Sequence, residues 1–247
     1  TNTAYVIQQI GSTVTNKPPV LIGLCEVENR NVLEDLVQQP SIEPYDYGVI
    51  HFESPDERGI DVALLYRKSS FVPEHFRKHV LYLYNTKRER DHTRDQLVVT
   101  GYLDGEQIHI IVNHWPSRSG GQARSAPYRL KAAKLNNQII DSINRLEPTA
   151  KIIGMGDFND DPTDDAFKKL LRTTGHKNNA LKQGLLFNPM EGLFKKGYGS
   201  SSFRDRWHML DQIYMTHHWL HPSEHSWRYW KAGVFQPPYL ITATGKY

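Results

Sequence analysis

A carboxylate and an amide two residues apart are the side chains of this sequence best placed for chemistry. Asp157 and Asn159 follow residues 151–156, an apolar run typical of a buried strand. Because alternate residues of an extended segment point to one face, we expect both side chains to present oxygen ligands together where the strand opens into a loop. Such hard oxygen ligands suit Mg²⁺ and phosphate. The alternative is a polar turn closed by an Asx hydrogen bond. Pro162 then predicts a first helical turn, with Asp160 or Asp161 as its cap.

A second carboxylate, Glu26, ends the apolar strand signal of residues 21–25. A helical pattern starts close behind it, near Asn29. A carboxylate at the C-terminal edge of a strand is placed as a metal ligand would be. Glu28 is expected on the same face as Glu26 or in the cap of the helix. Glu26, the deeper of the two acids, is therefore favoured as the metal ligand.

Arg58 lies in a polar turn that leads into a predicted strand over residues 60–67. Its guanidinium could hold a phosphate oxygen through a charge-assisted hydrogen bond. A surface pair with Asp56 or Glu57 explains the same residue equally well. Both interpretations stay open.

A β-branched strand at residues 110–112 also ends in polar side chains. Asn113 and His114 are candidate phosphate ligands there, and His114 can donate a hydrogen bond to a non-bridging oxygen as charge develops. A single histidine after a strand is more often structural, but the polar residues around this one favour a function. A long helix is predicted over residues 123–146, with Arg124 and Arg129 on its solvated face.

Asp211 falls inside an apolar strand pattern, where an unpaired carboxylate would be costly. Orienting a histidine base is one use for such an acid. A buried salt bridge to Arg204 or Arg206 is the alternative.

Taken in order, these motifs resemble the endonuclease/exonuclease/phosphatase superfamily over about residues 20–216. The resemblance rests on five places along the chain: Glu26, Arg58-Gly59, Asn113-His114, the Gly-Asp-Phe-Asn at residues 156–159, and Leu210-Asp211. It implies an α/β fold, a deoxyribonuclease-like four-layer α/β/β/α sandwich with two central mixed sheets. It also implies phosphoester hydrolysis assisted by Mg²⁺ or Mn²⁺.

The resemblance also implies a role for each matched residue. Glu26 corresponds to the metal-binding glutamate of the family. Asp157 and Asn159 correspond to the pair that handles the attacking water and the scissile phosphate. His114 corresponds to the histidine that stabilises the transition state, and Asp211 to the aspartate that orients the base histidine.

Two parts of the family pattern are not found in this sequence. The family opens with a strand that carries a metal-binding Asn and closes with one that carries Asp-His. Ser223-Glu224-His225 imitates the closing motif chemically but follows Asp211 too closely. We therefore expect one domain over residues 1–247 that lacks its first and last strands and belongs to a longer sequence.

Bulk properties narrow the class of protein. A net charge of +3 does not indicate a wholesale electrostatic clamp on nucleic acid. The single cysteine, Cys25, excludes an intrachain disulfide. No apolar run approaches the roughly 18 residues of a membrane span. We expect a soluble monomer, either cytoplasmic or exported after removal of a signal peptide.

The substrate class follows by elimination. The sequence lacks the hydrophobic membrane-docking loop that would suggest a sphingomyelinase. It also lacks a Lys/Arg cluster beside a tyrosine, which would mark an inositol-polyphosphate pocket. A phosphodiesterase or nuclease acting on DNA or RNA is favoured. The alternatives are a phosphomonoesterase for a sugar- or inositol-type phosphate and a non-catalytic module that binds nucleic acid or a partner.

Overall fold

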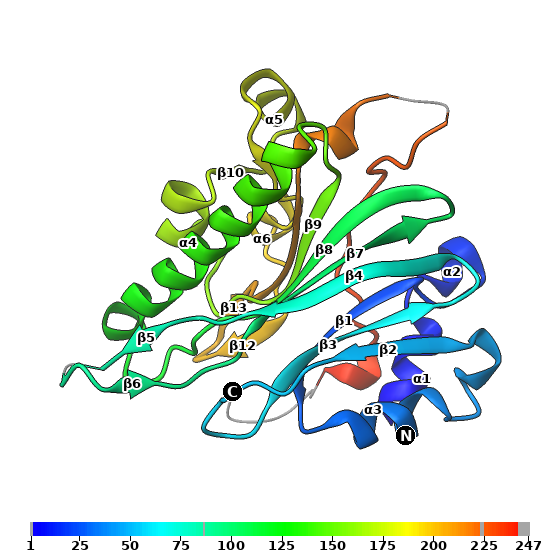
Figure 1. Ribbon diagram of the computed structural model, residues 1–247, viewed down its shortest axis with the longest axis horizontal. Coiled ribbons are helices and arrows are strands. Elements are labelled where there is room, and N and C mark those ends of the chain that lie inside the picture. The colour runs from blue at the N-terminus through cyan, green and yellow to red at the C-terminus, as the bar shows by residue number, and fades with distance from the viewer. Residues whose placement is uncertain (1, 86, 223–224, 242–247) are drawn as a thin grey trace. The chain divides into compact units, whose positions relative to one another are not determined.

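A computed structural model describes residues 2–85, 87–222 and 225–241 of the chain (Figure 1). The chain forms two compact units, Thr1–Pro116 with Gly154–Gly156, and Ser117–Ile153 with Asp157–Tyr247. Ser223 and Glu224 of the predicted Ser-Glu-His imitation lie outside the described residues. None of the described helices has the length and hydropathy needed to span a bilayer.

The first unit contains most of the strands. Its elements are α1 (Asn2–Gln9), α2 (Ser12–Thr15), β1 (Leu21–Val27), α3 (Arg30–Val37), the 3₁₀ helix η1 (Glu43–Tyr45), β2 (Tyr47–His51), β3 (Asp61–Arg67), β4 (Phe71–His79), β5 (Leu83–Tyr84), β6 (Arg90–Asp91), β7 (Gln96–Leu103) and β8 (Glu106–His114).

A three-stranded antiparallel sheet in the order β1-β3-β2 lies beside α3 in this unit. Ala63 and Leu65 of β3 join a buried cluster with residues of α1 and α3, including Ile7 and Leu33. Val62 and Leu64 alternate with them and are buried on the opposite face, and β3 also contacts β7 and β8. A strand covered on both faces must be apolar throughout, which explains why β3 shows no polar alternation.

The second sheet of this unit runs in the order β9-β8-β7-β4, with Gly154–Gly156 as its part of β9. The β4-β7 and β7-β8 pairs are antiparallel. Ile110, Ile111 and Val112 of β8 are fully buried. This apolar strand carries Asn113 and His114 at its end, as the sequence predicts.

The second unit contains the long helix and the remaining strands. Its elements are α4 (Gln122–Leu146), β9 (Ile152–Asp157, shared with the first unit), the π-helix η2 (Ala166–Leu170), β10 (Thr173–Thr174), α5 (Lys177–Gln183), β11 (Leu186–Phe187), α6 (Met190–Phe194), β12 (Ser201–Phe203), β13 (Arg206–His208), β14 (Asp211–Met215) and the 3₁₀ helices η3 (His217–Leu220) and η4 (Pro238–Leu240).

Its strands run in the order β10-β11-β14-β9, and the β10-β11 pair is parallel. Tyr214 of β14 is completely buried and donates a hydrogen bond to Asn136 of α4. Its ring also packs against Phe158 and Phe167, with centroids 5.7 and 6.5 Å away. The Phe158 amide donates to the Leu210 carbonyl at 2.9 Å. These contacts hold the loop after β9 against the start of β14.

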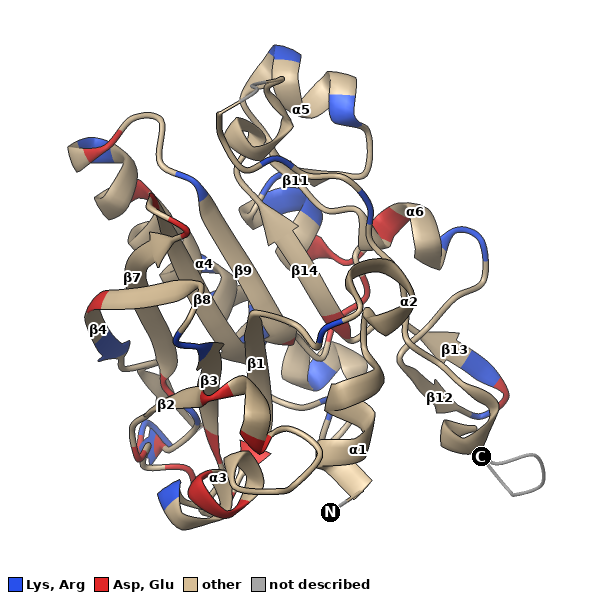
Figure 2. Cartoon of the chain, turned by 90° about the vertical axis from the view of Figure 1, so that its right-hand side faces the viewer, with Lys and Arg blue, Asp and Glu red and all other residues tan. Residues whose placement is uncertain are grey.

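Charge is spread over both units, as Figure 2 shows. Acidic and basic positions are interspersed along α3, where Arg30 and Glu34 form an ion pair at 2.7 Å. This distribution agrees with the small net charge of +3.

Most predicted element boundaries near the motifs are confirmed. The predicted helix of residues 123–146 is α4 (Gln122–Leu146), and β9 ends at Asp157. Asn29 caps α3 by accepting a hydrogen bond from the Val32 amide at 3.1 Å. The helix predicted to start at Pro162 is wrong, because the next helical segment begins at Ala166. The would-be caps, Asp160 and Asp161, are engaged in ion pairs instead.

The close approach of β9 to β8 requires glycine at position 156. Gly156 has φ 131°, and a Cβ there would lie 2.0 Å from the Asn113 carbonyl oxygen. We expect Gly156→Ala to lower the free energy of unfolding by several kcal/mol, because both strain and a backbone clash must be relieved. Gly105→Ala is the matched control, since it has φ 89° and nothing within 4 Å of the added Cβ. Equal losses of unfolding free energy in Gly156→Ala and Gly105→Ala, measured by urea denaturation, would contradict the clash.

Candidate functional site

Glu26 projects into solvent from a distorted point of β1. The β1-β3 register shifts between Leu24 and Val27, and Glu26 itself has φ 59°. A bulge of this kind re-aims a side chain, and the Glu26 side chain is 63% exposed. The prediction that Glu26 lies deeper than Glu28 is therefore not supported, because both are exposed. Exposed carboxylate oxygens at a strand end fit a Mg²⁺ or Mn²⁺ ion that keeps several of its waters.

Arg58 lies next to Glu26 in the same unit. Its Nη1 is 3.6 Å from Glu26 Oε1, and its Nε is 3.9 Å from Asp56 Oδ1. Asp56 is in turn held by Arg94, whose Nη1 donates to Asp56 Oδ2 at 2.9 Å. Arg58 thus has the acidic neighbour that one interpretation of the sequence predicts. Its half-exposed guanidinium also remains accessible to an anion.

His114 is almost completely buried at the end of β8, with 3% of its surface exposed. Burial, together with the positive charges of Arg94 and Arg58, lowers the pKa of His114 to about 3, against a smaller opposing effect of Asp56. The imidazole is therefore neutral at neutral pH. A neutral ring still offers one N–H donor, which is what a hydrogen bond to a phosphate oxygen requires.

Asn113 serves the fold, and the prediction that it binds phosphate is corrected. The residue is fully buried. Its Nδ2 donates to the carbonyls of Ile111 and Met155 at 3.0 and 3.4 Å, and its Oδ1 accepts from Trp115 Nε1 at 3.0 Å. Because both ends of the amide already have partners, Asn113 orients the end of β8 rather than a ligand.

Asp157 and Asn159 come together in the second unit through a turn, not through continued strand alternation. Asn159 adopts the left-handed region at φ 50°, which Asn tolerates well. Its backbone amide donates to Asp157 Oδ1 at 2.8 Å, and its Nδ2 donates to Asp157 Oδ2 at 3.3 Å. The Asx hydrogen bond offered as the alternative is therefore present. It also fixes the carboxylate against the amide, as a reactive pair would need.

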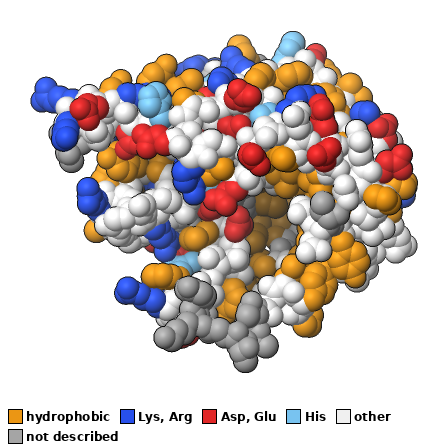
Figure 3. All heavy atoms as spheres, turned by 90° about the horizontal axis from the view of Figure 1, so that it is seen from below, with side chains coloured by type: hydrophobic (Ala, Val, Ile, Leu, Met, Phe, Trp, Pro, Cys, Tyr) orange, Lys and Arg blue, Asp and Glu red, His pale blue; other side chains and the backbone are white. Residues whose placement is uncertain are grey.

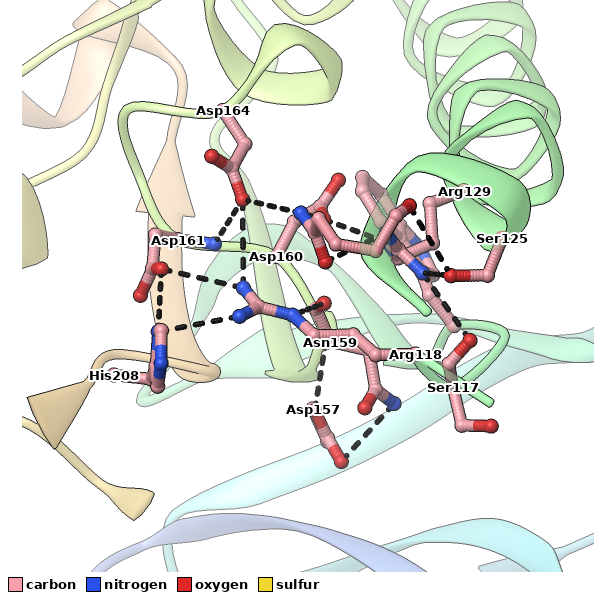
Figure 4. Close-up of polar contacts among 12 residues, drawn as sticks. Ser117, Arg118, Ser125, Arg129, Asp157, Asn159, Asp160, Asp161, Asp164 and His208 are labelled. Atoms are coloured by element: carbon pink, nitrogen blue, oxygen red, sulfur yellow. Dashed lines mark hydrogen bonds and ion pairs between the residues drawn. The ribbon is translucent and has the colours of Figure 1, made fainter. Parts of the chain in front are cut away.

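Arg118 holds the loop that carries this pair (Figure 4). Its Nε donates to the Asn159 carbonyl at 2.8 Å, and its Nη2 lies 3.2 Å from Asp161 Oδ2 and 3.4 Å from Asp164 Oδ2. Asp161 Oδ2 also accepts from His208 Nδ1 at 2.7 Å. One guanidinium thus fixes the backbone next to the Asp157–Asn159 turn and offsets the charge of two further acids.

Arg129 forms a second, buried support, and its predicted place on the solvated face of α4 is wrong. It is fully buried, and its Nε donates to Asp160 Oδ1 at 2.5 Å (Figure 4). Nη1 also donates to the Ser117 carbonyl at 3.2 Å and to Ser125 Oγ at 2.9 Å. Arg124, by contrast, is exposed as predicted.

Asp211 starts β14 and is exposed, so the predicted position inside a buried strand is corrected. Its backbone amide donates to Ser200 Oγ at 2.9 Å. The inward positions of this strand belong to Gln212 and Tyr214. An exposed acid at a strand start can still orient a histidine, and that role stays a prediction.

The sequence did not predict the contacts that support the site: it gave His208 and Arg94 no role, and Asp161 only that of a helix cap. Asp161, His208 and Arg94 are held by partners far away in the chain, so no local spacing revealed them. The only sequence signal was the density of acids after Asn159. A cluster of carboxylates that must fold into one loop requires cations from elsewhere.

Removing Arg129 should destabilise the second unit strongly. Arg129→Met leaves Asp160 buried without its cation, so we expect the free energy of unfolding to fall by about 3–5 kcal/mol. Arg124→Met, an exposed position on the same helix, should change it by less than about 0.5 kcal/mol. Urea denaturation of both variants tests this, and similar losses would contradict a buried ion pair.

The buried neutral His114 should make stability depend on pH. Its pKa is about 3 when folded and near 6.5 when unfolded, so the unfolded state binds the extra proton between these values. The contribution of the neutral His114 ring to the free energy of unfolding is complete above pH 6.5 and is lost progressively as the pH falls toward 3. Between pH 7 and 4.5 we expect wild type to lose about 2–3 kcal/mol more than His114→Gln. Parallel pH profiles of unfolding for the two proteins would contradict this.

Comparison with known proteins identifies the family to which this chain belongs. A sequence profile of the Endonuclease/Exonuclease/phosphatase family matches residues 1–247. A search of curated proteins found no match.

Several solved structures share the fold. The human Nocturnin catalytic domain, solved with a bound sulfate anion, has a TM-score of 0.59 and 18% identity, covering 87% of this chain and 74% of its own. Truncated Caenorhabditis elegans TDP2 has a TM-score of 0.59 and 16% identity, and the match covers 87% of this chain and 75% of TDP2. The Bacteroides thetaiotaomicron mannosyl-6-phosphatase Bt3783 has a TM-score of 0.54 and 15% identity, and the match covers 87% of this chain and 77% of Bt3783.

These likenesses confirm the predicted fold class, an α/β protein with mixed sheets. At such identities they concern the fold alone. The profile match, in contrast, spans the whole sequence. It shows that the chain belongs to the endonuclease/exonuclease/phosphatase family of phosphoesterases.

Proposed function

We propose that this protein is a Mg²⁺- or Mn²⁺-dependent phosphodiesterase or nuclease that hydrolyses its substrate through in-line attack by water. The observation that carries the proposal is the Asp157–Asn159 pair. Asp157 receives two hydrogen bonds from Asn159, at 2.8 and 3.3 Å, and Arg118 fixes the backbone of the same turn at 2.8 Å. A carboxylate held this way is positioned to orient a water molecule.

Asp157 is assigned the water, and the Asn159 amide a non-bridging phosphate oxygen. The hydrogen bonds between the two side chains support this division, because Asn159 Nδ2 already points toward an anionic oxygen. A phosphate oxygen that approaches the turn can share or replace that acceptor.

In the first unit, His114 and Arg58 are assigned contacts to phosphate oxygens, as the family resemblance implies for His114. The neutral His114 imidazole donates through one N–H, and its low pKa keeps it from becoming a competing cation. Arg58 adds positive charge beside Glu26, where its half-exposed guanidinium can pair with a phosphate oxygen. Asn113 supports His114 through the backbone of β8 and does not itself contact substrate.

Glu26 is assigned the metal ion. When bound, the ion supplies positive charge that polarises a phosphoryl oxygen and stabilises the leaving oxygen. The exposed carboxylate and the left-handed backbone of Glu26 support this assignment. Asp211 is assigned the orientation of a base histidine, as the family resemblance implies.

A diester or nucleic-acid substrate is favoured over a monoester. That preference rests on the elimination made from the sequence, because the structural relatives have varied descriptions: ANGEL2, with a TM-score of 0.51, is described as a 2′,3′-cyclic phosphatase, and Bt3783 as a mannosyl-6-phosphatase. On the face in Figure 3, basic, acidic and hydrophobic side chains are interspersed without a continuous basic stripe. On this face, nucleic acid would therefore be held by a few local contacts rather than by a long electrostatic groove.

Hydrolysis by the full-length protein that contains residues 1–247 tests the proposal. We expect cleavage of bis(p-nitrophenyl) phosphate and of plasmid DNA with Mg²⁺ or Mn²⁺, and none with EDTA. Asp157→Asn and His114→Gln should each lower turnover by about 10²–10⁴-fold, the usual scale for positioned acid–base and oxyanion groups. Initial rates with each substrate measure this.

Two exposed positions supply matched controls. Asp104→Asn and His75→Gln make the same chemical changes in exposed parts of the first unit and should leave turnover unchanged. Cleavage of p-nitrophenyl phosphate alone would assign a phosphomonoesterase instead. Wild-type rates in the Asp157 and His114 variants would remove both residues from the site.

A further inference from the structure

We propose that His217, His218 and His221 form a second metal site, which takes a transition-metal ion of the Zn²⁺ class. Their ligand nitrogens all lie within 4.8 Å of one another. Across residues 2–85, 87–222 and 225–241, no other group of three or more His, Cys, Asp or Glu meets this condition. The inference is independent of the proposed hydrolysis.

The local fold brings the three rings together. His218 and His221 are three residues apart on the 3₁₀ helix η3 and its C-cap, and positions i and i+3 of such a helix lie directly above one another. Their rings are stacked with centroids 5.9 Å apart, and the His217 ring lies 4.0 Å from that of His218. A tetrahedral ion with bonds near 2.0 Å needs nitrogens about 3.3 Å apart, so small ring rotations complete the site.

The turn that carries the histidines is anchored. The Thr216 hydroxyl accepts from the Ile152 amide at 3.1 Å and donates to the Ala150 carbonyl at 2.8 Å. Buried Trp219 donates through its indole to the Ile152 carbonyl at 3.2 Å. Thr216 and Trp219 thus hold η3 at the start of β9, which reduces the ordering that an ion would have to impose.

The surroundings of His218 suit its role as a ligand to a metal ion. The Pro148 carbonyl accepts a hydrogen bond from its ring, and a carbonyl on one ring nitrogen fixes the tautomer and leaves the other nitrogen for a metal. The nearby cation, Lys151, is turned to Ser226 Oγ and the Trp227 carbonyl. Its charge is therefore partly engaged away from the histidines.

A cavity of about 320 Å³ adjoins two of the three histidines. His217 and His218 line it together with Asp141, Asn144 and Arg172. Asn144 Oδ1 is buried there without a hydrogen-bond partner among the described residues. Three imidazoles leave a coordination position of a four-coordinate ion open, and this polar cavity gives a water or small anion access to it.

The site differs from the proposed catalytic centre in position and chemistry. Asp211 begins β14, and His217 follows its other end at Met215. Likewise, Asp157 ends β9, while the anchored turn sits at its start, Ile152. Imidazole nitrogens select Zn²⁺, Co²⁺ or Ni²⁺, whereas the oxygen ligands around Glu26 and Asp157 suit Mg²⁺. The η3 turn lies beside α5 (Figure 1).

Titration of the full chain with Co²⁺ tests the site, with excess Mg²⁺ present to occupy oxygen-ligand sites. We expect one equivalent of Co²⁺ to give the visible absorption of a low-symmetry, nitrogen-ligated ion, and Zn²⁺ to displace it. His221→Ala and His218→Ala should each weaken binding by at least about tenfold. Zn²⁺ should raise the melting temperature of wild type and not that of His221→Ala.

His221 is exposed, so its substitution should not impair folding. His75→Ala, an exposed histidine of the first unit, and Glu26→Gln should both retain Co²⁺ binding. Absence of the absorption band in folded wild type would overturn the proposal. So would undiminished binding in His221→Ala, or loss of the band in Glu26→Gln.

Discussion

Repulsion among carboxylates after β9 is the constraint on which the second unit depends. Five of the nine residues at 157–165 are aspartates. Left together in one loop, these charges would disfavour any compact arrangement. Arg129 forms a buried ion pair with Asp160, and the partly exposed Arg118 pairs with both Asp161 and Asp164. The conformation of the loop is therefore the one in which two guanidinium groups reach three carboxylates.

Hydrogen bonds and ion pairs both order the acids of this loop. Asp160, Asp161 and Asp164 pair with the two arginines, and the two amides of Asn159 donate to Asp157. The Asn159 donors fix the orientation of the Asp157 carboxylate. In the first unit, burial keeps the His114 ring neutral in a region that contains Arg58 and Arg94. Hydrogen bonds thus orient the candidate reactive group of the second unit, and burial sets the protonation state of the one in the first unit.

Local sequence patterns predicted much of the framework. The end of β9, the start of α3 near Asn29 and the extent of α4 follow from apolar runs and short-range hydrogen bonding, which adjacent residues specify. The same reasoning failed for Arg129 and Asp211. Arg129 was expected in solvent because arginine rarely enters a core without a partner, and its partner Asp160 is 31 residues away. Asp211 was expected inside the sheet, but β14 begins at that residue and leaves it exposed.

The sequence by itself determined the family, the strands and helices next to the motifs, and which strand ends carry acids, amides and histidine. Each of these is a property of short segments, where backbone preference and apolar spacing act between neighbours. Only the tertiary structure decided which charges are buried and what each one contacts. Arg118 meets His208 across 90 positions, and Glu26 turns outward at a bulge in the β1-β3 register. The stacking of His218 on His221 likewise needed the anchored 3₁₀ turn. Electrostatic pairing and coordination depend on distances in space, which a linear pattern does not contain.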